Sequence, residues 1–151
     1  MYASALMAFA HHLAAFTLVA ALAVEVALFK PPLSLLQARR LLRTDLVFGA
    51  SAGVLLVVGL LRVAYFEKGA AYYWHDSFFL AKLAAFLLAA LISVYPTLTF
   101  LSWSRTLKGG EAPGICPRTA QRVRTCLMLE LTAIVVILLC AAFMARGFGY
   151  R

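Results

Sequence analysis

The chain has 151 residues, of which 64% are hydrophobic and only 13% are charged, and its mean hydropathy is +0.92. This composition lies far outside that of a soluble domain and predicts an integral membrane protein. At about 20 residues per span, the length allows one domain with few membrane helices, which excludes a large transporter with inverted repeats. The net charge of +8 would suggest a nucleic-acid partner in a soluble protein. Here the basic residues lie mostly in two gaps between apolar stretches, so we expect no nucleic-acid partner.

Four apolar stretches are long enough to cross a bilayer, at about residues 2–29, 46–66, 78–101 and 126–145. No basic residue precedes the first stretch, and it is longer than the apolar core of a signal peptide, so we expect it to be retained as a helix. The sequence therefore predicts an all-α fold, a four-transmembrane-helix bundle that forms a single integral membrane domain over residues 1–151.

The basic residues also predict the orientation of this bundle. The first-to-second and third-to-fourth gaps hold nine Lys and Arg side chains, which are Lys30, Arg39, Arg40, Arg43, Arg105, Lys108, Arg118, Arg122 and Arg124. Because basic connections stay in the cytoplasm, both termini are expected on the non-cytoplasmic side. We expect a multi-pass protein of the bacterial inner (cytoplasmic) membrane, with the lipid bilayer as its surroundings.

Two features of the spans predict how the helices pack. Gly49 and Gly53 form a GxxxG pattern in the second span, which favours close packing within the chain over a homo-oligomer, the alternative use of the same small residues. Pro96 should kink the third helix and free a backbone carbonyl, for which nearby hydroxyl groups are plausible local partners. These hydroxyls belong to Ser93, Thr97 and Thr99.

Ionisable residues inside the spans are the candidates for function, because burying them is costly. Three carboxyls, those of Glu25, Asp45 and Glu130, fall in the inner half of the predicted bundle. We expect them to form ion pairs that hold the helices in register, with Arg43, Arg105 and Arg124 as partners. A proton or ion path through these carboxyls is the alternative. With two hydroxyls of the third helix, the predicted intramembrane polar network comprises Glu25, Asp45, Ser93, Thr97 and Glu130.

A second group, in the outer half, comprises His11, His12, Arg62 and Lys82. No carboxylate lies at the same depth, so an anionic ligand is expected to complete it. A b-type haem fits this pattern: an imidazole, with His11 as the metal ligand, would bind iron, and Arg62 and Lys82 would meet the propionates. Lys82 as a second iron ligand, a quinone as the ligand, and histidines that only hydrogen-bond within the bundle are alternatives.

Helical periodicity sorts these residues by face. At about 100° per residue, Glu25 points roughly 40° from His11, whereas His12 points about 100° away, so His11 and Glu25 should share a face. In the third helix the same spacing predicts one stripe of Lys82, Ala85, Ala89, Ser93, Pro96 and Phe100.

Several short motifs carry a resemblance to known families. They are His11-His12 early in the first helix, residues 39–45 before the second, Gly59 to Arg62 closing it, Phe79 to Lys82 opening the third, and Ser93 to Thr97 before Trp103. The chain resembles a family of uncharacterised four-helix bacterial membrane proteins over nearly its whole length. More distantly, it resembles HemJ-type protoporphyrinogen oxidases, which hold haem b, and CopD-like membrane proteins. The HemJ resemblance implies that His11 or His12 matches the haem-ligating histidine and Lys82 an essential lysine.

These observations lead to two hypotheses. The preferred one is a small membrane protein that binds haem b in the outer half of the bundle and passes electrons between a quinone or redox protein and an acceptor. The alternative is a non-enzymatic accessory or structural bundle, or a small-solute transport element. The residues leave open whether the protein is an enzyme, and they assign no catalytic residue.

Overall fold

The computed structural model describes residues 2–66 and 75–146, and within these ranges it contains helices and no extended sheet. Four helices are long and apolar enough to span a membrane, which confirms the predicted all-α, four-helix architecture. A short π-helix, η1, continues the second of them, and a short helix, α5, follows the third. The elements are α1 (Tyr2–Leu28), α2 (Leu35–Leu61), η1 (Arg62–Phe66), α4 (Ser77–Ser102), α5 (Ser104–Lys108) and α6 (Pro117–Ala145).

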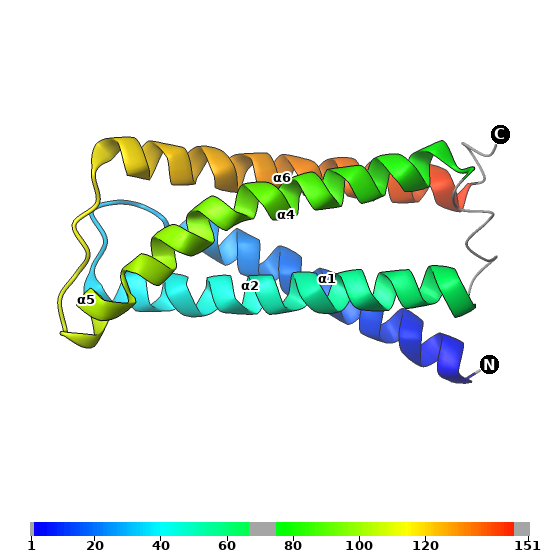
Figure 1. Ribbon diagram of the computed structural model, residues 1–151, viewed down its shortest axis with the longest axis horizontal. Coiled ribbons are helices and arrows are strands. Elements are labelled where there is room, and N and C mark those ends of the chain that lie inside the picture. Colours follow the sequence, from blue (N-terminus) through cyan, green and yellow to red (C-terminus); the bar gives the residue numbers. More distant parts are fainter. Residues whose placement is uncertain (1, 67–74, 147–151) are drawn as a thin grey trace.

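The four long helices run along one axis, and the connections fall at two ends (Figure 1). One end, which we call the basic end, holds the α1–α2 connection, α5 and the start of α6, together with the nine basic residues named above. The other, the terminal end, holds the start of α1, η1, the start of α4 and the end of α6.

Two helices begin well before the apolar stretches predicted for them. α2 begins at Leu35 because Ser34 and Gln37 form a capping box. The Ser34 hydroxyl accepts from the backbone N–H of Gln37 at 3.2 Å, and the side-chain oxygen of Gln37 accepts from the backbone N–H of Ser34 at 2.9 Å. α6 begins at Pro117, a residue suited to the first helical position. Apolarity marks only the part of a helix that lies in lipid, so these basic turns of α2 and α6 look like connections in the sequence.

The helices associate as two pairs. α1 packs mainly on α2, and α4 packs mainly on α6, whereas the contacts of α2 with α4 and of α1 with α6 are less extensive. Within the described residues, the backbones of α1 and α4 do not come into contact. At the basic end the Arg39 guanidinium donates to the Leu107 carbonyl at 2.9 Å and so ties α2 to α5.

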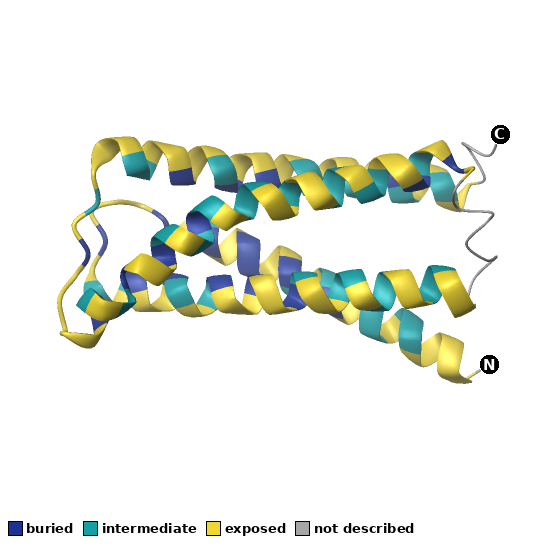
Figure 2. Cartoon of the chain, viewed as in Figure 1, coloured by how far each residue is buried: buried dark blue, intermediate teal, exposed yellow. Residues whose placement is uncertain are grey.

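The continuous core lies in the half of the bundle nearer the basic end. Figure 2 shows buried positions on all four long helices in this half, while most outward surfaces are exposed. Phe29, Phe100 and Trp103 form a chain of ring contacts with centroids 6.0 and 5.0 Å apart. The outward faces carry large apolar side chains such as Leu6 and Phe16, as expected of a surface that faces lipid.

The periodicity predictions for α1 and α4 are confirmed. His11 is half-buried and lies on the stripe that continues through Ala14 and Leu18 to Glu25, whereas His12 is exposed. In α4, Pro96 and Phe100 are buried and the other four members of the predicted stripe are half-buried.

The packing expected at the glycines of α2 is wrong. A Cβ atom built at Gly49 or Gly53 would meet no other atom within 4 Å, so the GxxxG pattern faces away from the chain's other helices. A spacing of small residues specifies a flat helix face but not the neighbour that covers it. Gly59 is different, since a Cβ there would lie 3.4 Å from Cε1 of His11. The close approach of α1 and α2 thus occurs at Gly59.

The hydroxyls near Pro96 also behave differently from the expectation. Ser93 donates to the Ala90 carbonyl and Thr99 to the Tyr95 carbonyl, both at 2.8 Å. The Thr97 hydroxyl points across the bundle instead and donates to Asp45.

Candidate functional site: a buried carboxyl cluster

Three carboxyl side chains from three helices are buried in the bundle. Glu25 of α1, Asp45 of α2 and Glu130 of α6 are 1%, 3% and 2% exposed. Each occupies a position that helical spacing reserves for the core: Asp45 follows Leu41 by four residues, and Glu130 follows Leu127 by three. An apolar residue would fit the pattern at each position, so the sequence places an acid where packing alone does not call for one.

The remaining long helix, α4, supplies a hydrogen-bond donor to these carboxyls. The Thr97 hydroxyl of α4 donates to Oδ1 of Asp45 at 2.8 Å. Glu25 lies within electrostatic reach of both other carboxyls, and Glu130 within reach of Asp45. We call Glu25, Asp45, Glu130 and Thr97 the carboxyl cluster.

Each carboxyl keeps one oxygen without a hydrogen-bond partner. These atoms are Oε1 of Glu25, Oδ2 of Asp45 and Oε1 of Glu130. Buried polar atoms are almost always hydrogen-bonded, because an unsatisfied one costs about 1–3 kcal/mol. Three such atoms in one cluster therefore indicate that something besides packing keeps these acids in place.

The ion pairs expected with Arg43, Arg105 and Arg124 do not form among the described residues, and the three arginines are exposed. The reason is rotational. Arg43 precedes Asp45 by two positions and so points about 200° away from it on α2, and Arg124 precedes Glu130 by six positions, about 240° away on α6. A similar position along the bundle axis does not make two side chains face each other.

Within residues 2–66 and 75–146, no group of three or more His, Cys, Asp or Glu side chains is arranged to hold a metal. Cys126 lies one turn before Glu130 on α6 and is half-buried. Ser93 is bonded to its own helix and does not join the cluster.

The histidine group is distributed over separate helix faces. The ring of His11 packs against Gly59 between α1 and α2. His12 is exposed, and its Nδ1 lies 2.6 Å from the Ala8 carbonyl oxygen. The two imidazole rings meet edge to face with centroids 6.0 Å apart. This arrangement leaves one histidine inside the α1–α2 pair and the other on its outer surface.

The two cations of that group come from different helix pairs. Arg62 is half-buried in η1, one turn after Gly59. Lys82 is half-buried on α4, where its Nζ lies 5.4 Å from the centre of the Phe79 ring, within cation–π range. The structure brings His11 close to Gly59, while among the described residues the backbones of α1 and α4 do not come into contact.

Sequence reasoning missed two features of the molecule. It did not pair Asp45 with Thr97, which lies 52 residues further along the chain, since nothing local signals that contact. It also used Lys30 only to orient the bundle, and Arg124 only for orientation and as an ion-pair partner of the acids, although both line a cavity between α1 and α6. The Pro31-Pro32 and Pro113-Gly114 breakers that frame this cavity were the available signal.

The fold and the buried acids together define a four-helix integral membrane protein with ionisable groups inside its spans. The chain belongs to the family described as predicted membrane protein (DUF2214), whose model matches residues 3–149. No curated protein and no solved structure matches the chain. The family thus supports the membrane assignment over nearly the whole chain.

Proposed function

We propose that this protein is a small-solute transport element of the membrane that works by binding and releasing protons at the carboxyl cluster. The observation that carries the proposal is the burial of Glu25, Asp45 and Glu130 together, each with one oxygen unsatisfied. Ionisable residues inside membrane spans are rare, and they mark ion pathways and proton relays.

Burial determines whether the neutral or the anionic form of these acids is favoured in the closed bundle, in which the two helix pairs are packed together. A carboxylate anion taken out of water without a cation partner costs far more than the neutral acid. Three anions within reach of one another would add mutual repulsion, which is strong in a low-dielectric interior. Protons are therefore the simplest ligands that stabilise the closed bundle.

The position of the cluster links proton binding to a change of shape. Glu25 and Asp45 come from the α1–α2 pair, whereas Thr97 and Glu130 come from the α4–α6 pair. The contacts between the pairs are less extensive than those within them. Loss of protons would repel carboxyls across this boundary and favour separation of the pairs, and such a two-state element is what coupled transport requires.

Infrared spectroscopy tests the proton binding directly. Protonated carboxylic acids have a carbonyl stretch distinct from that of carboxylates, and we expect a band of this kind in reconstituted protein at neutral pH. Glu25→Gln, Asp45→Asn and Glu130→Gln should each reduce it, while Glu111→Gln, at an exposed position in the α5–α6 connection, should leave it unchanged. Absence of the band in the parent protein would refute the proposal.

Proton flux tests the transport step. Liposomes that enclose a pH-sensitive dye and carry the protein should equilibrate a pH step faster than empty liposomes. We expect Glu25→Gln and Glu130→Gln to remove the difference and Glu111→Gln to retain it. Equal flux through all three variants would show that the carboxyl cluster has no role in proton transport.

A second candidate is the haem b protein that the sequence suggests, with His11 or His12 as ligand. One observation favours it: the Nδ1 of His12 is engaged by the Ala8 carbonyl, which leaves Nε2 as the ring nitrogen for a ligand. Histidines that bind metals are commonly oriented in this way. The fit is incomplete, because the backbone of α4, which carries Lys82, does not come into contact with that of α1 among the described residues. Bound haem would supply redox chemistry, and Arg62 and Lys82 would offer positive charge to its propionates.

The ultraviolet-visible spectrum of the purified protein distinguishes this candidate from the first. Haem predicts a Soret peak with α and β bands on reduction, lost in His12→Ala or His11→Ala. A colourless protein after expression with a haem precursor would exclude haem and leave the carboxyl proposal untouched, since the infrared band does not depend on a pigment.

A further inference from the structure

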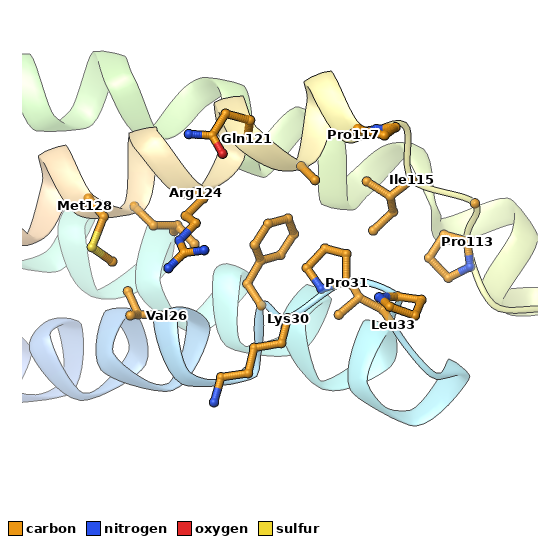
Figure 3. Close-up of a pocket in the computed structure, with 15 residues that line it drawn as sticks. Val26, Lys30, Pro31, Leu33, Pro113, Ile115, Pro117, Gln121, Arg124 and Met128 are labelled. Atoms are coloured by element: carbon orange, nitrogen blue, oxygen red, sulfur yellow. The ribbon is translucent and has the colours of Figure 1, made fainter.

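A cavity of about 830 Å³ lies between the end of α1 and the start of α6 at the basic end of the bundle. Figure 3 shows labelled side chains that line it from α1, the α1–α2 connection, the segment before α6, and α6 itself. Its volume is within the range of small-molecule sites. The contact between α1 and α6, which carry much of its lining, is limited.

The lining of this cavity changes in a regular order along the bundle axis. Nearest the middle of the bundle are the apolar side chains Val26, Leu127 and Met128. Lys30 and Arg124 come next, one from each side of the gap. Proline and glycine residues of the connections close the far end, at Pro31, Pro32, Pro113, Gly114 and Pro117.

Both cations are available for a ligand. Lys30 and Arg124 are exposed, and among the described residues neither side chain makes a hydrogen bond or an ion pair. Lys30 follows a helix of 27 residues, which spans about 40 Å against a hydrocarbon thickness of about 30 Å, so it lies near the level of the lipid headgroups. Basic pockets between membrane helices are typical sites for anionic headgroups.

From this order of apolar, basic and connecting residues we propose that the cavity binds an anionic phospholipid. The headgroup phosphate contacts Lys30 and Arg124, and an acyl chain runs along Val26 and Met128 toward the bilayer interior. Val26 follows Glu25, and Leu127 lies one turn before Glu130, so the lipid would border the carboxyl cluster. The proposal itself does not depend on proton binding there.

Native mass spectrometry of the full chain, released from detergent with added phosphatidylglycerol or phosphatidylcholine, tests this assignment. We expect phosphatidylglycerol to bind at least tenfold more tightly. The double variant Lys30→Gln/Arg124→Gln should weaken that binding roughly 30-fold, from about 1 kcal/mol for each basic residue near the headgroups.

A matched double variant controls for general attraction between the basic end and anionic lipid. Arg40→Gln/Arg122→Gln removes the same charge from exposed positions of the same end that do not line the cavity, and it should retain the affinity. Ala120→Phe, which fills the cavity without changing charge, should lose it. Circular dichroism confirms that each variant is folded.

Three outcomes would overturn the proposal: equal binding of both lipids, an equal loss in the two double variants, or unchanged binding in Ala120→Phe. Displacement of the lipid by an equal concentration of inorganic phosphate would also overturn it, because the site would then recognise phosphate alone. Proton flux is measured separately, so failure of this proposal and failure of the transport proposal are distinguishable.

Discussion

At the basic end of the bundle, aromatic and branched side chains from all four long helices pack into one continuous core, and Phe100 in that core is fully buried. At the terminal end, few side chains are buried, and the His11 ring of α1 packs against Gly59 of α2. The difference shows that side-chain packing within this chain is concentrated at the basic end. The half that holds the carboxyl cluster is fixed by the protein itself, and much of the other half presents its surface to lipid.

The largest expected effect comes from opening the core at the basic end. Phe100→Ala should lower the free energy of unfolding by about 3–5 kcal/mol, because a fully buried ring leaves a cavity. Phe16→Ala, at a position that is 74% exposed, should change it little. Thermal unfolding of both variants in the same detergent measures the difference. Equal losses would mean that the two faces are not distinct in the way the burial pattern indicates.

A smaller effect is expected at the terminal end. Gly59→Leu should cost about 1–3 kcal/mol, since its side chain would displace the His11 ring from the α1–α2 contact. Gly53→Leu on the same helix meets no neighbouring atom and should remain within about 0.5 kcal/mol of the parent. The same thermal assay applies. A larger loss at Gly53 than at Gly59 would show that the outward face is covered by a partner.

The smallest effect concerns the hydroxyl of the carboxyl cluster. Thr97→Val should cost about 1 kcal/mol, because Asp45 would lose its hydroxyl donor. Thr132→Val is the control, since that exposed hydroxyl donates only to the Met128 carbonyl of its own helix. Paired unfolding measurements, each against the parent, give the difference. No difference between the two would mean that the bond across the bundle contributes nothing to the closed state.

Much of the architecture could be predicted from the sequence, for a physical reason. Lipid requires long apolar helices, so four spans are visible in composition alone. The inward faces of α1 and α4 follow from helical periodicity, because a rotation of 100° per residue is a local property. Helix starts were missed at Leu35 and Pro117, since turns outside the lipid need not be apolar.

The partners of the buried groups could not be predicted in the same way. The expected arginine pairs share the depth of the acids but not their direction, and the bond from Thr97 to Asp45 joins helices far apart in the chain. The GxxxG pattern of α2 likewise specifies a face without its neighbour. Periodicity fixes the angle of a residue on its own helix, whereas the choice of partner depends on how helices are arranged around one another.

The order of the two helix pairs along the chain has a consequence for biogenesis. The α1–α2 pair is made first and brings Glu25 and Asp45 into the membrane before α4 and α6 exist. The hydroxyl that Asp45 accepts from is translated 52 residues later, so the acids of the first hairpin have no hydrogen-bond donor from α4 during that interval. Docking of the second hairpin then removes these polar groups from lipid, and the cost of leaving them there favours assembly of the two hairpins in the bilayer.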